Sequence, residues 1–235
     1  MGSQMKTQGF TLFEIIVATA IFVIVSTLMV SFFSLSLEYF NAGSSQADVQ
    51  METQYALSTL EKEVQQSDSG GIYPAYPNGS NDLVFISAQN SSGQFVVYNG
   101  SSNCGTESNS AAAGEPCWQG WVAYYLTPQS GTSYYELIRK EEFLPSSQDS
   151  TVVPTPIPTA ASIETAAGPQ TVMDQYVQSN TAFNVQTSCG ISGIYYLQLT
   201  AEKVYGGELT SYNPGVQVNN GSCASGNWIL ALPEN

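Results

Sequence analysis

The sequence contains no histidine, and it has only five basic residues against nineteen acidic ones, for a net charge of −14. Without histidine, a zinc site of the cysteine–histidine kind is excluded, and the commonest general base of active sites is absent. The basic residues are scattered along the chain, so they form no electrostatic footprint for nucleic acid. They are Lys6, Lys62, Arg139, Lys140 and Lys203. We therefore expect no charge-driven binding of nucleic acid.

Motifs that carry catalysis are also missing. There is no GxSxG nucleophile motif, no glycine-rich phosphate loop and no group of acids with the spacing of a metal site. We interpret the run RKEE at residues 139–142 as a solvated charged segment, and Asn219 and Asn220 lie near too few acids to predict a calcium site. We expect no enzyme, no cofactor and no bound metal, and a membrane-tethered enzyme is the least favoured function.

Cysteines are few, and none of the four forms a CxxC pair. Their even number, at positions far from the apolar N-terminal segment, predicts two disulfides and therefore an oxidising compartment. Four cysteines can form two disulfides in three different ways. We favour Cys104–Cys117 and Cys189–Cys223, because each pair closes a local loop rich in Gly, Ser and Asn. The alternative is four buried free thiols.

The chain has one long hydrophobic run. From Phe10 to Leu37 there is no base, proline or glycine, and Glu14 is the only charged residue before the run reaches Glu38. The run is longer than the roughly 20 residues that a helix needs to cross the hydrocarbon core of a membrane. The stretch LEYF that follows has an acid and aromatic residues suited to the far interface. We predict a membrane-spanning helix over residues 10–37.

The residues before this run do not resemble an ordinary signal peptide. The leader MGSQMKTQG, residues 1–9, has a single base, the apolar run is too long for a signal peptide, and no AxA cleavage site follows it. The alternative is cleavage between Gly9 and Phe10, which leaves the helix on the mature protein. Glu14 would then be the fifth mature residue.

The stretch GFTLFEIIVA, from Gly9 to Ala18, resembles the processing site of type IV prepilins and type II secretion pseudopilins. The resemblance implies cleavage after Gly9 by a prepilin peptidase, methylation of the Phe10 amine and a role for Glu14 in assembly. It also implies a single span in the inner membrane, with the head in the periplasm or outside. The inner-membrane assembly platform would then add the subunit to a fibre, beside a major pilin and other minor pilins.

Glu14 lies where a charge is costly. A lone carboxylate in a bilayer costs about 2.5–3.5 kcal/mol or more on insertion scales and is usually paired. Cleavage creates a positive amine on Phe10, one helical turn away, and the amine of a neighbouring subunit can lie equally close. We predict that this pairing offsets the cost and sets the axial register between subunits. The alternative is that Glu14 reaches water near the end of the helix.

A helical pattern continues beyond the membrane segment. Between Gln46 and Ser67, apolar residues recur with the spacing of one helix face; they are Val49, Ala56, Leu57, Leu60 and Val64. Gly70 and Gly71 end the pattern. We predict one helix over residues 10–69, with its first half in the membrane and its second half amphipathic. We interpret the apolar face as core packing under a globular head, and not as a ligand site.

The head, residues 70–235, consists of short aromatic and β-branched runs between Gly, Asn, Ser and Pro, a pattern that predicts strands. The predicted strands are Leu83–Ser87, Gln94–Tyr98, Trp121–Thr127, Tyr134–Arg139, Ala182–Thr187, Ile194–Ala201 and Trp228–Leu232. The loops QNSSG and PQSGT suit hairpins within the first and second pairs of strands. The predicted fold class is α+β, and by the resemblance type IV pilin-like: a long N-terminal helix packed against an antiparallel sheet.

Residues 152–169, VVPTPIPTAASIETAAGP, form an insertion rich in Pro, Thr and Ala. Its prolines favour an extended, solvated chain, so we expect a mobile surface loop. A target for sugar attachment or an adhesive loop is the alternative.

Tyrosines occur in adjacent pairs along the predicted strands, at Tyr124 and Tyr125, Tyr134 and Tyr135, and Tyr195 and Tyr196. Adjacent residues of a strand face opposite ways, so we expect one tyrosine of each pair in the core and the other exposed. Exposed tyrosines could form a binding surface, but we favour ordinary strand packing.

The order of elements is similar to that of the larger minor pilins and minor pseudopilins of fibre tips. We expect a structural subunit that is built into a type IV pilus or related fibre, or that primes or caps its tip. The alternatives are a type II secretion pseudopilin and a tip adhesin or uptake receptor whose head binds a surface ligand. The acidic head argues against direct contact with DNA.

Overall fold

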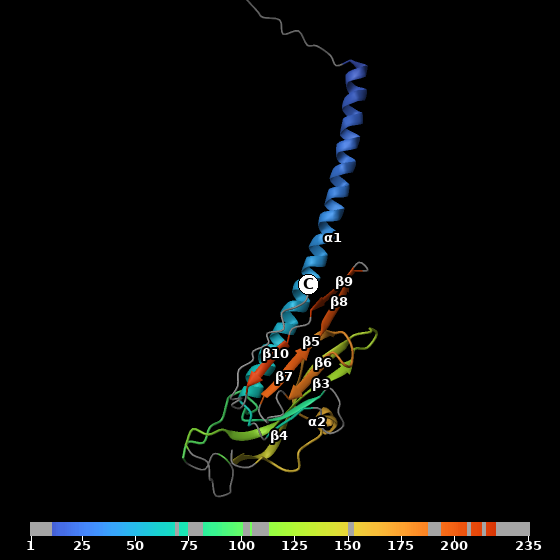
Figure 1. Ribbon diagram of the computed structural model, residues 1–235. Helices are drawn as coiled ribbons and strands as arrows, with labels where there is room; N and C mark the ends of the chain where they lie inside the picture. Colours follow the sequence, from blue (N-terminus) through green and yellow to red (C-terminus); the bar gives the residue numbers. More distant parts are fainter. Residues whose placement is uncertain are drawn as a thin grey trace, which may run out of the picture.

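A computed structural model describes residues 11–68, 71–74, 82–100, 104, 113–149, 153–187, 194–205, 208–212 and 215–219. The chain begins with one long helix, α1 (Leu12–Gln65), whose second half lies along the β-rich head while its first half extends away from it (Figure 1). Its 54 residues measure about 81 Å at a rise of about 1.5 Å per residue. The predicted long helix is confirmed, and it ends at Gln65, before the two glycines.

The first half of α1 has no partner within the described chain. Its large apolar side chains are exposed on all sides, from Leu12 at 79% to Phe40 at 72%. An 18-residue window has a mean hydropathy of 2.6, and none of it is buried. This helix is therefore long and apolar enough to cross a membrane, which agrees with the span predicted from the sequence.

Hydroxyl groups in this half are satisfied by the helix itself. Thr19, Thr27, Ser31 and Ser34 each donate a hydrogen bond to a backbone carbonyl three or four residues earlier, at 2.8–3.0 Å. A polar group without a partner is costly in hydrocarbon, and these internal bonds remove that cost.

The second half of α1 buries the face that its spacing predicted. Val49, Ala56, Leu57, Leu60 and Val64 are all at most 2% exposed. They pack on an antiparallel sheet of seven strands, in the order β1-β2-β3-β4-β5-β8-β9. The strands are β1 (Ile72–Pro74), β2 (Leu83–Ser87), β3 (Cys117–Pro128), β4 (Tyr135–Asp149), β5 (Gln170–Val177), β8 (Ala201–Tyr205) and β9 (Glu208–Tyr212).

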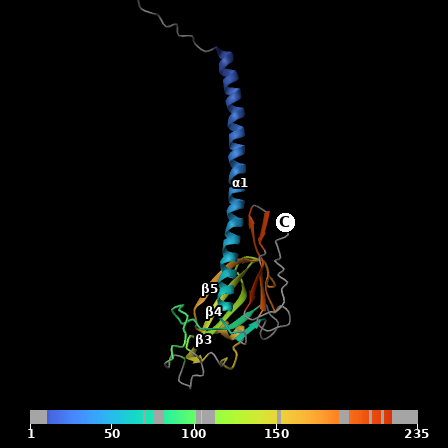
Figure 2. The same cartoon turned by 60° about the vertical axis from the view of Figure 1, so that its left-hand side comes forward.

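A second, smaller sheet contains three antiparallel strands in the order β10-β7-β6. They are β10 (Gly215–Asn219), β7 (Ile194–Leu199) and β6 (Phe183–Thr187). The predicted strand Ile194–Ala201 is divided between the two sheets, because the chain leaves β7 at Thr200 and enters β8. There the backbone of Thr200 bonds to Ala182 and Gln178 instead of continuing the ladder. Figure 2 shows the strands gathered along the lower half of α1.

The seven-stranded sheet is covered on both faces. One face packs on α1, and the other packs on α2 (Ala160–Thr165) and the chain before it, where Ala160 is 4% and Ile163 is 0% exposed. The prediction of a mobile, solvated loop at residues 152–169 is therefore wrong for the described part, because apolar residues of this segment are buried against the sheet. Val153 and Ile157 also pack against this second core.

Two further predictions need correction. Tyr124 and Tyr125 are both buried, at 0% and 5% exposure, because each face of β3 is covered. Gln94–Tyr98 is not a strand, although Phe95 and Val97 form isolated bridges with Gln89 and Pro116. Its loop does turn back as a hairpin does, with Gly93 at a φ of 73°.

The remaining expectations have mixed outcomes. Leu83–Ser87 is confirmed as β2, and the hairpin between β3 and β4 is confirmed with longer strands than expected. The strands β1, β5, β9 and β10 were not predicted, nor was β8 beyond its first residue, Ala201. Trp228–Leu232 lies outside the described residues, as do the side chains of Tyr195 and Tyr196.

Candidate functional site at the start of the N-terminal helix

Glu14 forms a capping box with Thr11 at the start of α1. Thr11 has extended backbone geometry, and its hydroxyl accepts a hydrogen bond from the Glu14 N–H at 3.3 Å. In return, Oε2 of Glu14 accepts from the Thr11 N–H at 2.8 Å and from its hydroxyl at 3.0 Å. The pair thus satisfies two N–H groups that a helix start leaves without helical partners.

This geometry fixes the carboxylate of Glu14 beside the first residues of the helix. A negative charge at a helix N-terminus also interacts favourably with the helix dipole. Both hydrogen bonds given above for the carboxylate of Glu14 fall on Oε2. Gly9 and Phe10 lie outside the described residues, but Phe10 is bonded covalently to Thr11, whose N–H Glu14 already binds.

The role of Thr11 was missed in the sequence. The signal was present, because a Thr followed three residues later by a Glu, just before an apolar run, is the pattern of a capping box.

Comparison with known families bears directly on this segment. Residues 4–30 match the prokaryotic N-terminal methylation motif, which is typical of type IV pilin-like proteins with a prepilin leader. The long apolar helix followed by a curled antiparallel sheet is consistent with the pilin fold. The matched motif supports a type IV pilin-like or pseudopilin-like protein. No curated protein and no solved structure matches it.

The head contains one disulfide among the described residues. Cys104 and Cys117 are joined, with their Cα atoms 5.2 Å apart, and both are at most 2% exposed. This is the local pairing that the sequence favoured. Cys189 and Cys223 lie outside the described residues, so their pairing stays a prediction.

A buried ionic cluster joins α1 to the sheet. Glu63 of α1 accepts hydrogen bonds from Nε of Arg139, at 2.9 and 3.0 Å, and from the hydroxyl of Tyr124 at 2.8 Å. Arg139 also contacts Glu141. Burial and the charge of Glu63 raise the pKa of Tyr124 well above its ordinary value. Burial opposes the charge of Arg139, but hydrogen bonds and attraction from Glu63 outweigh this and raise its pKa.

The charged run at residues 139–142 is therefore not a solvated segment, contrary to the prediction. Arg139 is paired beneath α1, and Lys140 on the opposite face is 6% exposed and donates to the carbonyl oxygen of Glu164. Both faces of β4 are covered, so successive charges are drawn into contacts on opposite sides of the sheet. These contacts hold α1 on one face of the sheet and α2 on the other.

A second buried acid, Asp174 of β5, also faces α1. It is 1% exposed, and its Oδ2 lies 2.8 Å from the hydroxyl of Thr53. Burial, with a smaller effect from the nearby charge of Glu52, raises the pKa of Asp174 to about 6. Among the described residues, no three His, Cys, Asp or Glu side chains are placed to hold a metal ion.

Proposed function

We propose that this chain is a minor pilin or minor pseudopilin: a structural subunit that is cleaved between Gly9 and Phe10, methylated on Phe10 and added to a type IV pilus or related fibre. The observation that carries the proposal is the Thr11–Glu14 capping box at the start of a helix whose first half is apolar and exposed. Proteins of this motif class are structural rather than enzymatic.

The capping box gives Glu14 a partner before assembly. While the subunit is in the membrane before assembly, the Thr11 N–H and hydroxyl stabilise the carboxylate at its Oε2. After cleavage, the amine of Phe10 follows directly on Thr11, and the other oxygen, Oε1, is the one that we assign to the amine of a neighbouring subunit. Each subunit would thereby be set at a fixed axial step from the next.

The rest of the chain supports this role. The first half of α1 has no cover of its own, so it needs a membrane before assembly and neighbouring helices after it. The Cys104–Cys117 disulfide agrees with a head that folds in an oxidising compartment such as the periplasm. The partners are then a prepilin peptidase, the inner-membrane assembly platform and other pilins.

Mass spectrometry of sheared surface fibres and of the membrane fraction tests the proposal. The expected species begins at methylated Phe10. In surface fibres at a low ratio to the most abundant pilin, it identifies a minor pilin, whereas the same species confined to the membrane fraction identifies a secretion pseudopilin or an assembly primer. An uncleaved chain beginning at Met1 would overturn both.

A further inference from the structure

The strand β5 depends on α1 for part of its bonding. Its ladder with β4 is interrupted by register shifts on both sides of Leu137, and it meets β8 at a single residue pair, Val177 with Ala201. The backbone N–H of Gln175 donates to the carboxylate of Glu52 on α1 at 3.3 Å, and its side-chain amide donates to the same carboxylate at 2.8 Å. Side chains of the helix therefore hold this strand where strand pairing is sparse.

A buried hydroxyl and a buried acid make the central contact between α1 and β5. Oγ1 of Thr53 lies 2.7 Å from the carbonyl oxygen of Val49 and 2.8 Å from Oδ2 of Asp174, whose Oδ1 accepts from the Tyr176 N–H at 2.8 Å. A hydroxyl has one proton to donate, so both short distances are hydrogen bonds when Asp174 is protonated and donates to Thr53. Loss of that proton leaves two acceptors for the single proton of the hydroxyl.

The surroundings of Asp174 oppose a negative charge. Burial, with a smaller effect from the charge of Glu52, raises the pKa of Asp174 to about 6. The two bases on this side of the sheet are engaged with other acids, Arg139 with Glu63 and Lys203 with Asp48. The titratable and charged groups that face Asp174 from the elements around it are Glu52 and Tyr55 on α1, Arg139 on β4, Tyr176 on β5 and Lys203 on β8.

A hollow lies beside the buried acid. Its volume is about 280 Å³, and its walls include Glu52, Tyr55, Val172 and Asp174. Val172 of β5 is 49% exposed, so this part of the strand already borders solvent. A small movement of β5 away from α1 would widen the hollow and let water reach the carboxylate, which removes the cost of a buried charge.

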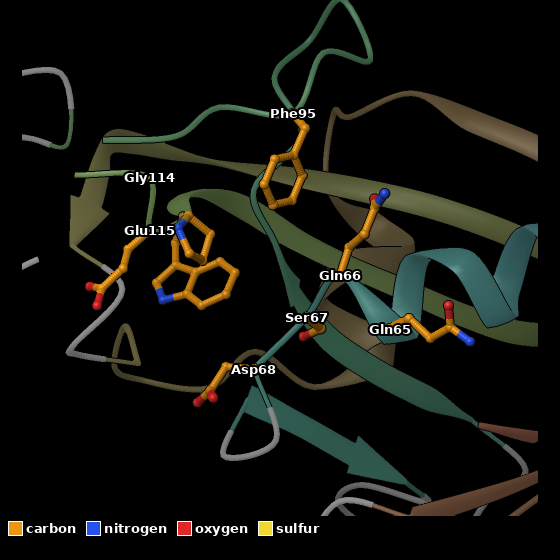
Figure 3. A pocket seen from close by; sticks show the side chains of 9 residues that line it. Gln65, Gln66, Ser67, Asp68, Phe95, Gly114 and Glu115 are labelled. Carbon is orange, nitrogen blue, oxygen red and sulfur yellow. The ribbon is translucent and has the colours of Figure 1, made fainter. Parts of the chain in front are cut away.

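The end of α1 is anchored independently of β5. Gln66 accepts a hydrogen bond from Gln89 at 3.2 Å, and Glu63 is held in the buried ionic cluster. At this end, α1 and the head line a pocket of about 630 Å³ whose walls include Gln66, Phe95 and Trp118 (Figure 3). A release of β5 would therefore leave this end of the helix in place.

We propose that the Thr53–Asp174 contact is a pH-sensitive switch: β5 is held on α1 while Asp174 carries a proton, and it is released locally when that proton passes to water. The folded pKa is raised above the ordinary 3.8, so the contact is fully stabilised below pH 3.8 and loses this stabilisation as pH rises through about 6. The switch concerns the joint between head and helix and does not depend on the subunit role.

Hydrogen–deuterium exchange of the full chain in detergent micelles tests the switch, with protection measured relative to an unstructured chain at the same pH. Between pH 4.5 and pH 8, the protection of β5 amides should fall at least about tenfold, because a shift of about two pH units changes the ratio of open to closed contact by up to about a hundredfold. At pH 8, β5 should be at least about tenfold less protected than β3, since a local release leaves β3 paired.

Asp174→Asn keeps the size of the side chain but cannot ionise, so the protection of β5 should no longer depend on pH. The matched control is Glu61→Gln, which changes an acid of α1 that contacts Gln65 and should keep the wild-type dependence. The proposal is overturned if β5 is equally protected at both pH values, if β5 and β3 are equally protected at pH 8, or if the dependence persists in Asp174→Asn. None of these outcomes bears on the Thr11–Glu14 cap, so failure here is distinct from failure of the subunit role.

Discussion

At the scale of single residues, the decisive feature is an acid that is already bound at the start of its own helix. Glu14 is held by Thr11 within its own helix, which lowers the cost of placing a carboxylate in an apolar segment. The same contact keeps the charge at the helix start, where cleavage would create an amine. In the function proposed above, capping and assembly use the same carboxylate, and substitutions can separate the two roles.

Glu14→Gln should leave cleavage intact and lower incorporation into fibres by at least about tenfold. The amide oxygen can still accept from Thr11, but the charge that pairs with an amine is lost, and the pairing that offsets about 2.5–3.5 kcal/mol disappears with it. The measurement is the ratio of this chain to the major pilin in sheared fibres, with the membrane fraction as the reference for processing.

Thr11→Val is the matched control for that substitution. It removes the capping hydroxyl, a loss of about 1 kcal/mol, but keeps the charge of Glu14. Incorporation should therefore fall less than in Glu14→Gln. If Glu14→Gln enters fibres as the wild type does, the carboxylate has no part in assembly and the pairing is wrong.

Asp174 predicts a pH dependence of head stability. Its pKa is about 6 in the folded chain against an ordinary 3.8, so the folded state binds the proton more tightly than the unfolded state does. Its contribution to stability is therefore complete below pH 3.8 and is lost as pH rises through 6, by about 3 kcal/mol. The geometry agrees, because the single proton of the Thr53 hydroxyl has two acceptors, Val49 O at 2.7 Å and Asp174 Oδ2 at 2.8 Å.

Asp174→Asn should remove this loss and make the head more stable than the wild type at pH 8. The measurement is the unfolding midpoint by near-ultraviolet circular dichroism between pH 4.5 and pH 8. Asp48→Asn, which changes an exposed acid on α1, should keep the wild-type slope. Equal slopes for the wild type and Asp174→Asn would show that Asp174 is not the titrating group.

At the scale of elements, the head is fastened to α1 by the Glu63–Arg139 cluster. Because this pair is buried, removal of Glu63 leaves the charge of Arg139 with only its contact to Glu141, and it leaves Tyr124 without its acceptor. Glu63→Leu alone should therefore cost about 3–5 kcal/mol of unfolding free energy, measured by urea unfolding. The double variant Glu63→Leu with Arg139→Met should cost less than Glu63→Leu alone, since it removes both charges of the pair and leaves only Glu141, which is 12% exposed. If the loss of unfolding free energy in the double variant equals the sum of the losses in the two single variants, this account is wrong.

The packed insertion gives a second prediction at this scale. Ile163 of α2 is fully buried against the far face of the sheet, so Ile163→Ala should cost about 2–5 kcal/mol in the same unfolding measurement. The matched control is Val172→Ala, which shortens a side chain that is 49% exposed on β5 and should cost little. A loss of unfolding free energy below about 0.5 kcal/mol for Ile163→Ala would be typical of a surface residue and would contradict the burial of this side chain.

These elements also show where sequence patterns were sufficient. The face of α1 was predictable because its apolar residues have a regular spacing, and those from Val49 to Val64 that keep this spacing are buried, whereas Met51 and Tyr55 beside them are exposed. The strand β5 was not, because bulges in its pairing with β4 break the alternation of buried and exposed residues. The insertion was misjudged because composition favoured an extended chain, whereas tertiary packing against the sheet decided the outcome.

The candidate site was predictable for a different reason. The leader, the Gly9–Phe10 position, the acid and the helix length all lie in one continuous segment, so no tertiary contact was needed to find them. Tertiary contacts were needed for Arg139, Asp174 and the pocket at Trp118, since their partners lie far away along the chain. Charge and composition alone made Arg139 resemble a surface residue.

At the scale of the whole molecule, charge argues for a subunit that is dispersed among others. The net charge is −14, and cleavage after Gly9 would remove Lys6 and make it more negative still. Identical heads packed side by side would bring like charges together where they touch, and charges closer than about 8 Å are not largely screened at physiological salt. A fibre made only of this chain would therefore be destabilised by repulsion between its heads.

This predicts a dependence on a second subunit. Expressed with the assembly platform as the sole pilin-like protein, the chain should yield no surface fibres, because repulsion between like heads opposes each added copy. With a less acidic major pilin it should appear in fibres at a low ratio, measured by quantitative mass spectrometry of the sheared fraction. Abundant fibres of this chain alone at physiological salt would mean that neighbouring heads bury or neutralise their acids, and the role of a minor subunit would then be wrong.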